Sequence, residues 1–307
     1  MIEVRQLTKR YGPKVAVDGL DFTAKPGEVT GFLGPNGAGK STTMRMIIGL
    51  DRPTSGTATV NGRRYAEHRA PLHEIGALLE ARAVHPGRTA RNHLLGLART
   101  HGIPRKRVDE VIDLAGLGAV AGKRVGAFSL GMGQRLGIAQ ALLGDPATIM
   151  LDEPVNGLDP DGVLWVRNLL VELAAEGRTV LLSSHLMSET AMIADHLVIA
   201  GRGRLLADTT VEELIDQNDA GVRVSSDDAG RLRGLLAGPG VKITSTTAEE
   251  LTVTGLSARR IGEIANKNNV PLYELSAQSV SLEEAFMALT HHAVEYTAAV
   301  PSSGKAA

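Results

Sequence analysis

Hydrophobic and polar residues alternate along the first 210 or so residues in a way that is typical of strands separated by helices. Short apolar runs predict strands at Glu28–Leu33, Ile75–Leu79, Thr148–Leu151, Thr179–Ser183 and Leu197–Ala200. Apolar residues at helical spacing predict helices at Ser41–Leu50, Ala90–Thr100, Arg107–Ala115, Gln134–Leu143, Val163–Ala175 and Met187–Ala194. This alternation indicates an α/β fold, in which helices cover a buried and mostly parallel sheet.

The stretch between Ala81 and Pro146 has a different pattern, because helical segments follow one another there with little strand signal. We therefore expect a helical subdomain, at about residues 81–146, that is inserted into the α/β core. The core and the insertion together form a first predicted domain over residues 1–218.

The pattern changes again after Leu205, where a capping box formed by Thr210 and Glu213 predicts the start of a short helix. Further strands are predicted at Val222–Ser225, Val241–Ser245, Leu251–Thr254 and Pro271–Leu275, and further helices at Asp228–Leu236 and Ala258–Asn268. A second capping box, Ser281 with Glu284, predicts the final helix LEEAFMALT. These segments favour a small C-terminal α+β domain over residues 219–290.

The last 17 residues, HHAVEYTAAVPSSGKAA, are small, polar and unpatterned, so we predict a disordered tail over residues 291–307. The pair His291–His292 could ligate a metal ion, but we interpret it as part of this solvated tail.

Composition narrows the classes of function. The chain has 307 residues, of which 43% are hydrophobic and 22% are charged, and this is ordinary for a globular protein with a sizeable core. Its net charge of −1 favours neither nucleic acid nor an anionic membrane as a partner. The absence of cysteine excludes disulfides, thiolate catalysis and zinc sites that use cysteine. No apolar run approaches the roughly 18 residues of a spanning helix, so we expect a cytoplasmic chain whose membrane role, if any, comes through a partner.

A glycine-rich loop carries the first chemical signal. The stretch GPNGAGKS at Gly34–Ser41 fits the phosphate-binding pattern G-x-x-x-x-G-K-[ST] and lies between a predicted strand and a predicted helix. Backbone N–H groups of such a loop, with the helix N-terminus behind them, bind phosphate oxygens. We expect Lys40 to reach the β- and γ-phosphates and Ser41 to offer its hydroxyl to Mg²⁺. The candidate nucleotide-binding set is Tyr11, Gly34, Pro35, Asn36, Gly37, Ala38, Gly39, Lys40, Ser41 and Thr42.

Two further strand ends supply candidate catalytic groups. The segment TIMLDEP predicts a buried strand that places Asp152 at its carboxyl end, where open α/β sheets bind ligands. We expect Asp152 to hold Mg²⁺ and Glu153 to act as the general base toward an attacking water. His185, in SSHL at the end of another apolar strand, could contact the γ-phosphate and help to hold that water. A polar strand terminus without function is the simpler alternative for this histidine.

A second glycine-rich turn, FSLGMGQR at Phe128–Arg135, directly precedes an apolar helix. Together with the phosphate loop, LDEP, NGLD and SSH, it follows the order and approximate spacing of an ATP-binding cassette (ABC) ATPase, which the chain resembles over about residues 1–210. This resemblance implies a P-loop NTPase core that binds ATP and Mg²⁺ and hydrolyses ATP. Tyr11 stands where the family stacks an aromatic ring on adenine.

The resemblance also implies that the signature turn acts on another subunit. The family pattern L-S-G-G-Q is degenerate here, where Ser129 and Gly131 are kept, Leu130 is substituted and Gln134 follows. In cassettes of this type the turn closes over ATP held by the phosphate loop of a second copy, and Asp159 in NGLDP would lie at the same interface. A single copy is therefore expected to bind ATP but to hydrolyse it poorly.

One departure points to a subtype. After the strand that follows the phosphate-loop helix, most cassettes have a glutamine. This chain has Glu80 there, which could still ligate Mg²⁺ through oxygen. Glutamate there resembles the ATPase subunits of drug, antibiotic and lantibiotic exporters, and so does the C-terminal stretch SVSLEEAFMALT. The implied function is the energy-coupling subunit of an exporter of a drug, an antibiotic peptide or a lipid-like substrate, which forms a homodimer and docks on a separate membrane permease near Val84–Asn92 at the cytoplasmic face.

Three alternatives remain at this point. One is the ATPase subunit of an importer, and another is a soluble cassette ATPase that serves DNA repair or ribosomes. The third is a regulatory module that holds ATP without hydrolysing it. A single phosphate loop, no sustained heptad run and no basic patch beyond PRKR at Pro104–Arg107 argue against the second, and against nucleic acid as a partner. The intact Glu153 and His185 argue against the third.

Overall fold

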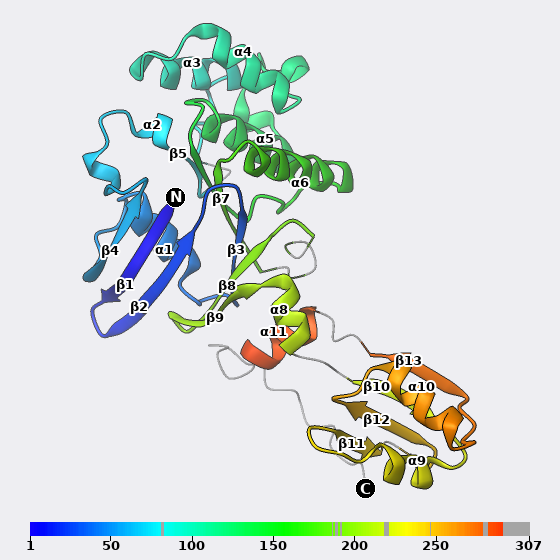
Figure 1. Ribbon diagram of the computed structural model, residues 1–307. Helices are drawn as coiled ribbons and strands as arrows, with labels where there is room; N and C mark the ends of the chain where they lie inside the picture. Colours follow the sequence, from blue (N-terminus) through cyan, green and yellow to red (C-terminus); the bar gives the residue numbers. More distant parts are fainter. Residues whose placement is uncertain are drawn as a thin grey trace, which may run out of the picture. The chain divides into compact units, whose positions relative to one another are not determined.

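The computed structural model of the chain describes residues 1–80, 83–185, 187, 190, 192–217, 221–245, 247–278 and 282–290 (Figure 1). Its contacts divide the chain into two compact units, one built from Met1–Thr210 together with the residues from Leu289 on, and the other from Val211–Ala288. Several predicted features lie outside the described residues: the boundary after residue 218, Ser281, the tail 291–307 with its histidine pair, and parts of the predicted helix at 187–194.

A six-stranded sheet forms the centre of the first unit, with the strand order β5-β6-β7-β3-β8-β9. Neighbouring strands from β5 to β8 run parallel, and β9 pairs antiparallel with β8 at the edge. The bounds of the strands are β3 Val29–Leu33, β5 Ile75–Leu78, β6 Thr148–Asp152, β7 Thr179–Ser184, β8 His196–Gly201 and β9 Arg204–Thr210. The five predicted strands are therefore confirmed within one or two residues, and β9 was not predicted.

The first unit also contains an antiparallel sheet of three strands, which the sequence pattern did not predict. Its order is β2-β1-β4, and the strands span β1 Ile2–Tyr11, β2 Lys14–Ala24 and β4 Ser55–Val60. Helix α1, Lys40–Ile47, packs against both sheets. Its fully buried Met44 and Ile47 join Leu20 of the antiparallel sheet and Phe32 of the six-stranded sheet in one core cluster. The helix that follows the phosphate loop is thereby fixed from two sides.

The remaining helices of the first unit cover the sheet and build the insertion. Within the described residues they include α2 Pro71–Glu74, α3 Ala90–Thr100, α4 Arg105–Leu114, α5 Leu130–Ala141 and α6 Pro160–Ala175, with short 3₁₀ turns at Tyr65–Glu67, Gly118–Val120 and Val125–Ala127. Helices α3 and α4 pack together, α5 packs on β5, and α6 packs on β7 and β3. The predicted helix at Ala90–Thr100 is confirmed with its bounds, whereas α5 begins four residues earlier than predicted, inside the second glycine-rich turn.

The contact between β5 and α5 leaves no room for a side chain at Gly76. A Cβ atom at this position would lie 1.8 Å from the Ala141 carbonyl oxygen of α5. We therefore expect Gly76→Ala to lower the free energy of unfolding by roughly 1–3 kcal/mol through overpacking, measured by urea denaturation. Gly96→Ala in α3 is the matched control, because a Cβ there meets nothing within 4 Å. This control should stabilise the protein by about 0.5–1 kcal/mol; equal midpoints for both variants would contradict the packing argument.

The second unit has its own fold and its own core. Its strands are β10 Val222–Ser225, β11 Lys242–Ser245, β12 Glu250–Thr254 and β13 Glu274–Ala277, and its helices are α8 Val211–Gln217, α9 Ala229–Leu236, α10 Ala258–Lys267 and α11 Leu282–Thr290. The order β10-α9-β11-β12-α10-β13, with the sheet order β11-β12-β10-β13, is the split β-α-β arrangement of ferredoxin-like domains. The predicted strand at Pro271–Leu275 was misplaced, since pairing with β10 begins only at Glu274.

Candidate functional site

The parallel sheet brings three distant segments to one edge. Strand β3 ends at Leu33, directly before the phosphate loop, and Leu33 is paired with Ser184 of β7. Ser183 is paired in turn with Asp152, the last residue of β6. Because neighbouring parallel strands end at the same side, the glycine-rich loop, the LDEP segment and the SSH segment converge there.

A cleft of about 540 Å³ opens at this edge. Its lining contains most of the predicted nucleotide-binding set, and the full list is Tyr11, Lys14, Ala16, Asn36, Gly37, Ala38, Gly39, Lys40, Ser41, Thr42, Leu79, Asp152 and Glu153. The volume lies in the range of sites that hold a small organic ligand or cofactor. Glu80 is exposed and is absent from this lining, in which its neighbour Leu79 takes part.

The phosphate loop is shaped by its closeness to other backbone. Gly39 caps the N-terminus of α1 with a φ of 96°, and a Cβ atom there would lie 2.6 Å from the Ala16 carbonyl oxygen. Only glycine fits both constraints. The first turn of α1 therefore begins at the cleft, and its free N–H groups and positive dipole end favour an anion there.

Lys40 is buried at the base of this loop, and 8% of its surface is exposed. Its ammonium Nζ donates a hydrogen bond to the Gly34 carbonyl oxygen at 2.6 Å and a longer one to Pro35 at 3.4 Å. Burial lowers the pKa of the Lys40 ammonium, and the carboxylates of Glu153 and Asp152 oppose this shift. The cation is thus preorganised beside a loop whose N–H groups and charge suit phosphate.

The Asp152 carboxylate and the Glu153 backbone are held by the neighbouring strand β7. The Ser183 hydroxyl donates a hydrogen bond to Asp152 Oδ1, and the same hydroxyl accepts the Glu153 N–H at 3.1 Å. Glu153 has a φ of 49°, in the left-handed region that a side chain rarely adopts. Backbone in such a conformation persists only where its surroundings fix it, and it is common at functional sites.

The Glu153 side chain and backbone have two further contacts. His185 Nδ1 lies 2.8 Å from Glu153 Oε2, and Gln134 Nε2 of α5 donates to the Glu153 carbonyl oxygen at 2.8 Å. Gln134 is 4% exposed, so it connects the helix of the second glycine-rich turn to the carboxylate loop instead of facing solvent. The predicted base and the predicted histidine therefore meet directly.

The second glycine-rich turn builds a separate site on the same chain. Ser129 caps α5 by accepting the Met132 N–H at 3.2 Å, and Asp159 caps α6 by accepting the Gly162 N–H at 2.9 Å. Both lie along a groove of about 300 Å³, which is lined by Ser129, Leu130, Gly131, Met132, Arg135, Gly157, Leu158 and Asp159. This lining shares no residue with the phosphate-loop cleft.

A family model described as ABC transporter matches residues 17–156. The bacitracin transport ATP-binding protein BcrA of Bacillus licheniformis is 43% identical over 221 residues, which are 71% of this chain and 72% of the relative. The chain belongs to the ABC transporter ATP-binding protein family. It is an ATPase with a P-loop NTPase fold, as the motifs predicted.

Other relatives of this ABC ATPase extend the comparison. The uncharacterized ABC transporter ATP-binding protein YhcH of Bacillus subtilis is 35% identical and covers 94% of this chain and 96% of its own length. The Nod factor export ATP-binding protein I of Ralstonia nicotianae is 38% identical over 77% of this chain and 76% of its own length. A domain of unknown function (DUF8746) matches residues 220–283 of the second unit.

Among solved structures, a dimeric ATP-binding cassette in a post-hydrolysis state, bound to ADP and Pi, matches with a TM-score of 0.63. It is 25% identical and covers 69% of this chain and 99% of its own length. Within the described part of the ABC ATPase, no helix has the length and apolar character that a membrane crossing requires.

Three contacts of this ABC ATPase were missed by the sequence analysis. Ser183 binds the Asp152 carboxylate and the Glu153 backbone N–H, although only its place in SSHL was noted. Tyr11 donates its hydroxyl hydrogen bond to Asp51 Oδ2 at 2.9 Å, on a loop that carries no recognised motif. The Arg135 guanidinium stacks over the Trp165 ring at 4.5 Å and donates to the Ala115 carbonyl, so it connects α5 to α6.

Proposed function

We propose that this ABC ATPase hydrolyses Mg·ATP to power export through a separate membrane permease. The observation that carries the proposal is the shared cleft, in which Lys40, Ser41, Asp152 and Glu153 converge and His185 contacts Glu153. The test of ATP turnover is phosphate release by the purified protein with ATP and Mg²⁺. A chain that binds ATP but releases no phosphate, even as a dimer, would favour the regulatory alternative.

Different residues of the cleft would bind the phosphates, the adenine ring and Mg²⁺. Backbone N–H groups of the loop between Asn36 and Thr42 and the Lys40 ammonium would bind the phosphates, and Tyr11 would stack on adenine. The hydroxyl of Ser41 and the carboxylate of Asp152 are oxygen donors on the same cleft wall, a set that suits Mg²⁺. Mg²⁺ would neutralise charge on the β- and γ-phosphate oxygens. Glu80 remains a further candidate ligand, one residue beyond Leu79.

Glu153 is the candidate general base. Its carboxylate, fixed by His185 and by the strained backbone that Ser183 supports, would orient a water toward the γ-phosphate and take its proton. His185 would hold Glu153 in place and donate to the γ-phosphate region. Lys40 would stabilise the charge that develops on the transferred group.

A second copy of the chain would complete each site. The groove of Ser129, Gly131 and Asp159 lies apart from the cleft of its own chain, so an anion site at the start of α5 is available to another subunit. The dimeric state of the ADP-bound cassette relative supports this arrangement. ATP that binds the closed dimer more tightly than the open one would shift the population toward closure, and release of phosphate would reopen it.

Export, and a permease that lies outside this chain, are supported by the relatives. Their names include bacitracin transport and Nod factor export, so an antibiotic peptide or a lipid-like molecule is the proposed class of substrate. These names favour export over the importer and the soluble non-transport alternatives. The proposed location is the cytoplasmic face of a membrane.

The permease would dock on a groove of about 410 Å³ to which Val84 and Pro86 of the predicted segment Val84–Asn92 contribute. Its lining residues are Val84, Pro86, Val125, Gly126, Phe128, Ser129, Leu130 and Gly133. The groove of about 300 Å³ at the second glycine-rich turn is called the signature groove below, and the docking groove shares Ser129 and Leu130 with it. Movement of a docked permease segment would therefore displace residues of the proposed ATP interface.

We expect Pro86→Asp, which places a charge in this exposed part of the groove, to abolish co-purification with the membrane protein encoded by a neighbouring gene. ATP turnover by the isolated protein should persist, since Pro86 is absent from the cleft lining. Arg99→Asp, at an exposed position in α3 outside the groove, is the control and should co-purify normally. Retained co-purification of Pro86→Asp would place the docking site elsewhere.

A further inference from the structure

Tyr11 needs an anchor to keep a defined orientation. It is the last residue of β1 and is 48% exposed, so packing alone does not fix its ring at the mouth of the cleft. Its hydroxyl donates a hydrogen bond to Asp51 Oδ2 at 2.9 Å, across 40 residues of sequence. Lys9 Nζ lies 4.8 Å from the centre of the ring. The phenol is therefore held at its far end by a carboxylate.

Asp51 is itself fixed to helix α1. Arg45 Nε, in the last turn of α1, donates to the same Asp51 Oδ2 at 2.9 Å. The Asp51 N–H donates to the Arg45 carbonyl oxygen at 3.2 Å. On the other side, Lys9 Nζ donates to the Arg52 carbonyl oxygen at 2.7 Å. The loop after α1 is thus tied both to the helix before it and to the end of β1.

The protonation states of Asp51 and Tyr11 suit the hydrogen bond between them. The Arg45 hydrogen bond lowers the pKa of the Asp51 carboxyl against the opposing effect of its burial, and Tyr11 and Lys9 also lower it. Burial and then the Asp51 carboxylate raise the pKa of the Tyr11 phenol, with Arg45 and Thr42 opposing. At neutral pH the carboxylate is ionised and the phenol protonated, so the acceptor and the donor are both in the required form.

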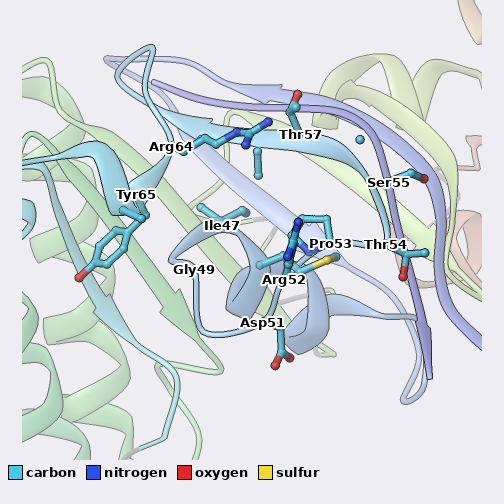
Figure 2. Close-up of a pocket in the computed structure, with 14 residues that line it drawn as sticks. Ile47, Gly49, Asp51, Arg52, Pro53, Thr54, Ser55, Thr57, Arg64 and Tyr65 are labelled. Atoms are coloured by element: carbon cyan, nitrogen blue, oxygen red, sulfur yellow. The ribbon is translucent and has the colours of Figure 1, made fainter. Parts of the chain in front are cut away.

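Asp51 also lines a second groove, which is separate from the phosphate-loop cleft, but its carboxylate does not point into that groove. That groove, of about 380 Å³, lies between α1 and β4 and is lined by residues that include Ile47, Thr57 and Arg64. Figure 2 shows the Asp51 side chain directed away from these groups. Its partners in the described structure are Tyr11 and Arg45.

We infer that Asp51 is a positioning residue for the nucleotide base, holding the ring of Tyr11 at a fixed distance from the phosphate loop. This inference rests on the proposed ATP site. Helix α1 begins at Lys40 of the phosphate loop and ends next to Asp51, so one rigid element sets the phosphate site at one end and the base platform at the other. Removal of the carboxylate takes away the hydrogen bond from the Tyr11 hydroxyl to Asp51 and leaves the residues of the phosphate loop unchanged.

We expect Asp51→Ala to raise the KM for ATP roughly three- to tenfold with kcat unchanged, because the net contribution of one exposed hydrogen bond is lost. Tyr11→Phe, which keeps the ring but loses the hydroxyl, should give a similar increase. The double variant should be no worse than either single one, since both remove the same interaction. Asp51→Asn keeps an acceptor oxygen and should stay close to the wild type.

The decisive measurement uses a ligand without a base. Inorganic tripolyphosphate should compete for the phosphate loop of Asp51→Ala as well as it does in the wild type, because only the base platform has changed. Asp227→Ala is the matched control, since Asp227 accepts the hydroxyl hydrogen bond of the exposed Tyr273 in the second unit. It should leave the KM for ATP unchanged.

Two results would overturn the inference: an unchanged KM in Asp51→Ala, or an equal loss of affinity for tripolyphosphate, which would mean that Asp51 only stabilises the loop. Failure of the proposed function is distinguishable from both, because it would appear in the wild type as an absence of ATP binding or Mg²⁺-dependent turnover.

Discussion

Glu153→Gln is expected to lower ATP turnover by about 10²–10⁴-fold while ATP remains bound. Glutamine has nearly the same shape and can still accept the hydrogen bond from His185, but it cannot take a proton from the attacking water. Loss of a negative charge beside the γ-phosphate should also favour the ATP-bound dimer. Phosphate release gives the turnover, and size-exclusion chromatography with ATP gives the dimer fraction.

Glu172→Gln, at an exposed position of α6 away from the cleft, is the control and should behave as the wild type. Unchanged turnover in Glu153→Gln would show that another group accepts the proton. A variant that loses ATP binding together with turnover would instead indicate that Glu153 supports the loop and not the chemistry.

If two copies share each site as proposed, two inactive variants should restore activity when they are mixed. Lys40→Ala removes the phosphate-loop cation, and Ser129→Arg fills the signature groove, so each variant alone should lose activity by on the order of 10²-fold. In a mixed dimer with two-fold symmetry, both substitutions fall in one site and the other site is intact. An equimolar mixture should therefore recover about a quarter of the wild-type turnover, because half of the dimers have one of their two sites intact.

The control mixture combines Lys40→Ala with Glu153→Gln. Both residues line the cleft of the same chain, so in a mixed dimer each site carries one defect and no activity should return. Recovery in this control, or none in the first mixture at concentrations where dimers form, would contradict a site shared between two copies.

The convergence of the phosphate loop, the LDEP segment and the SSH segment could be predicted from the sequence because it depends on a simple rule. Apolar runs such as Thr148–Leu151 and Thr179–Ser183 mark buried parallel strands, and chemically distinctive residues follow them directly. Parallel strands end at one edge, so Lys40, Asp152 and His185 had to meet there. Their roles in the reaction remain proposals for the experiments above.

The antiparallel sheet could not be predicted, because its alternation is interrupted. The pairing of β1 with β2 shifts register between Val4 and Leu7 and again further along, and Gln6 adopts a φ of 46°. Each bulge moves the following side chains to the other face, so the period of two disappears from the sequence. In the second unit, the apolar residue Leu272 after Pro271 packs against the core, but it is not part of a strand. Hydrogen-bonded pairing with β10 starts only at Glu274, so the apolar pattern indicated a buried residue and not the start of the strand.

The side-chain contacts that position the residues of the site also could not be predicted from the sequence. Ser183 and Asp152 are 31 residues apart, and Tyr11 and Asp51 are 40 apart. Hydrophobic periodicity carries information on which face of an element is buried, but not on which polar side chains pair across distant loops. These partners can be identified only from the structure, in which α1 and the strands fix the ends of the loops that carry them.

The stack of Arg135 on Trp165 has a practical consequence. The chain contains a single tryptophan, and its indole lies under a guanidinium that lines the signature groove. Indole emission responds to the charges and water around the ring, so docking of a second copy on this groove would change it. The protein thus contains an intrinsic optical reporter, and stopped-flow fluorescence could time the meeting of two subunits without any attached dye.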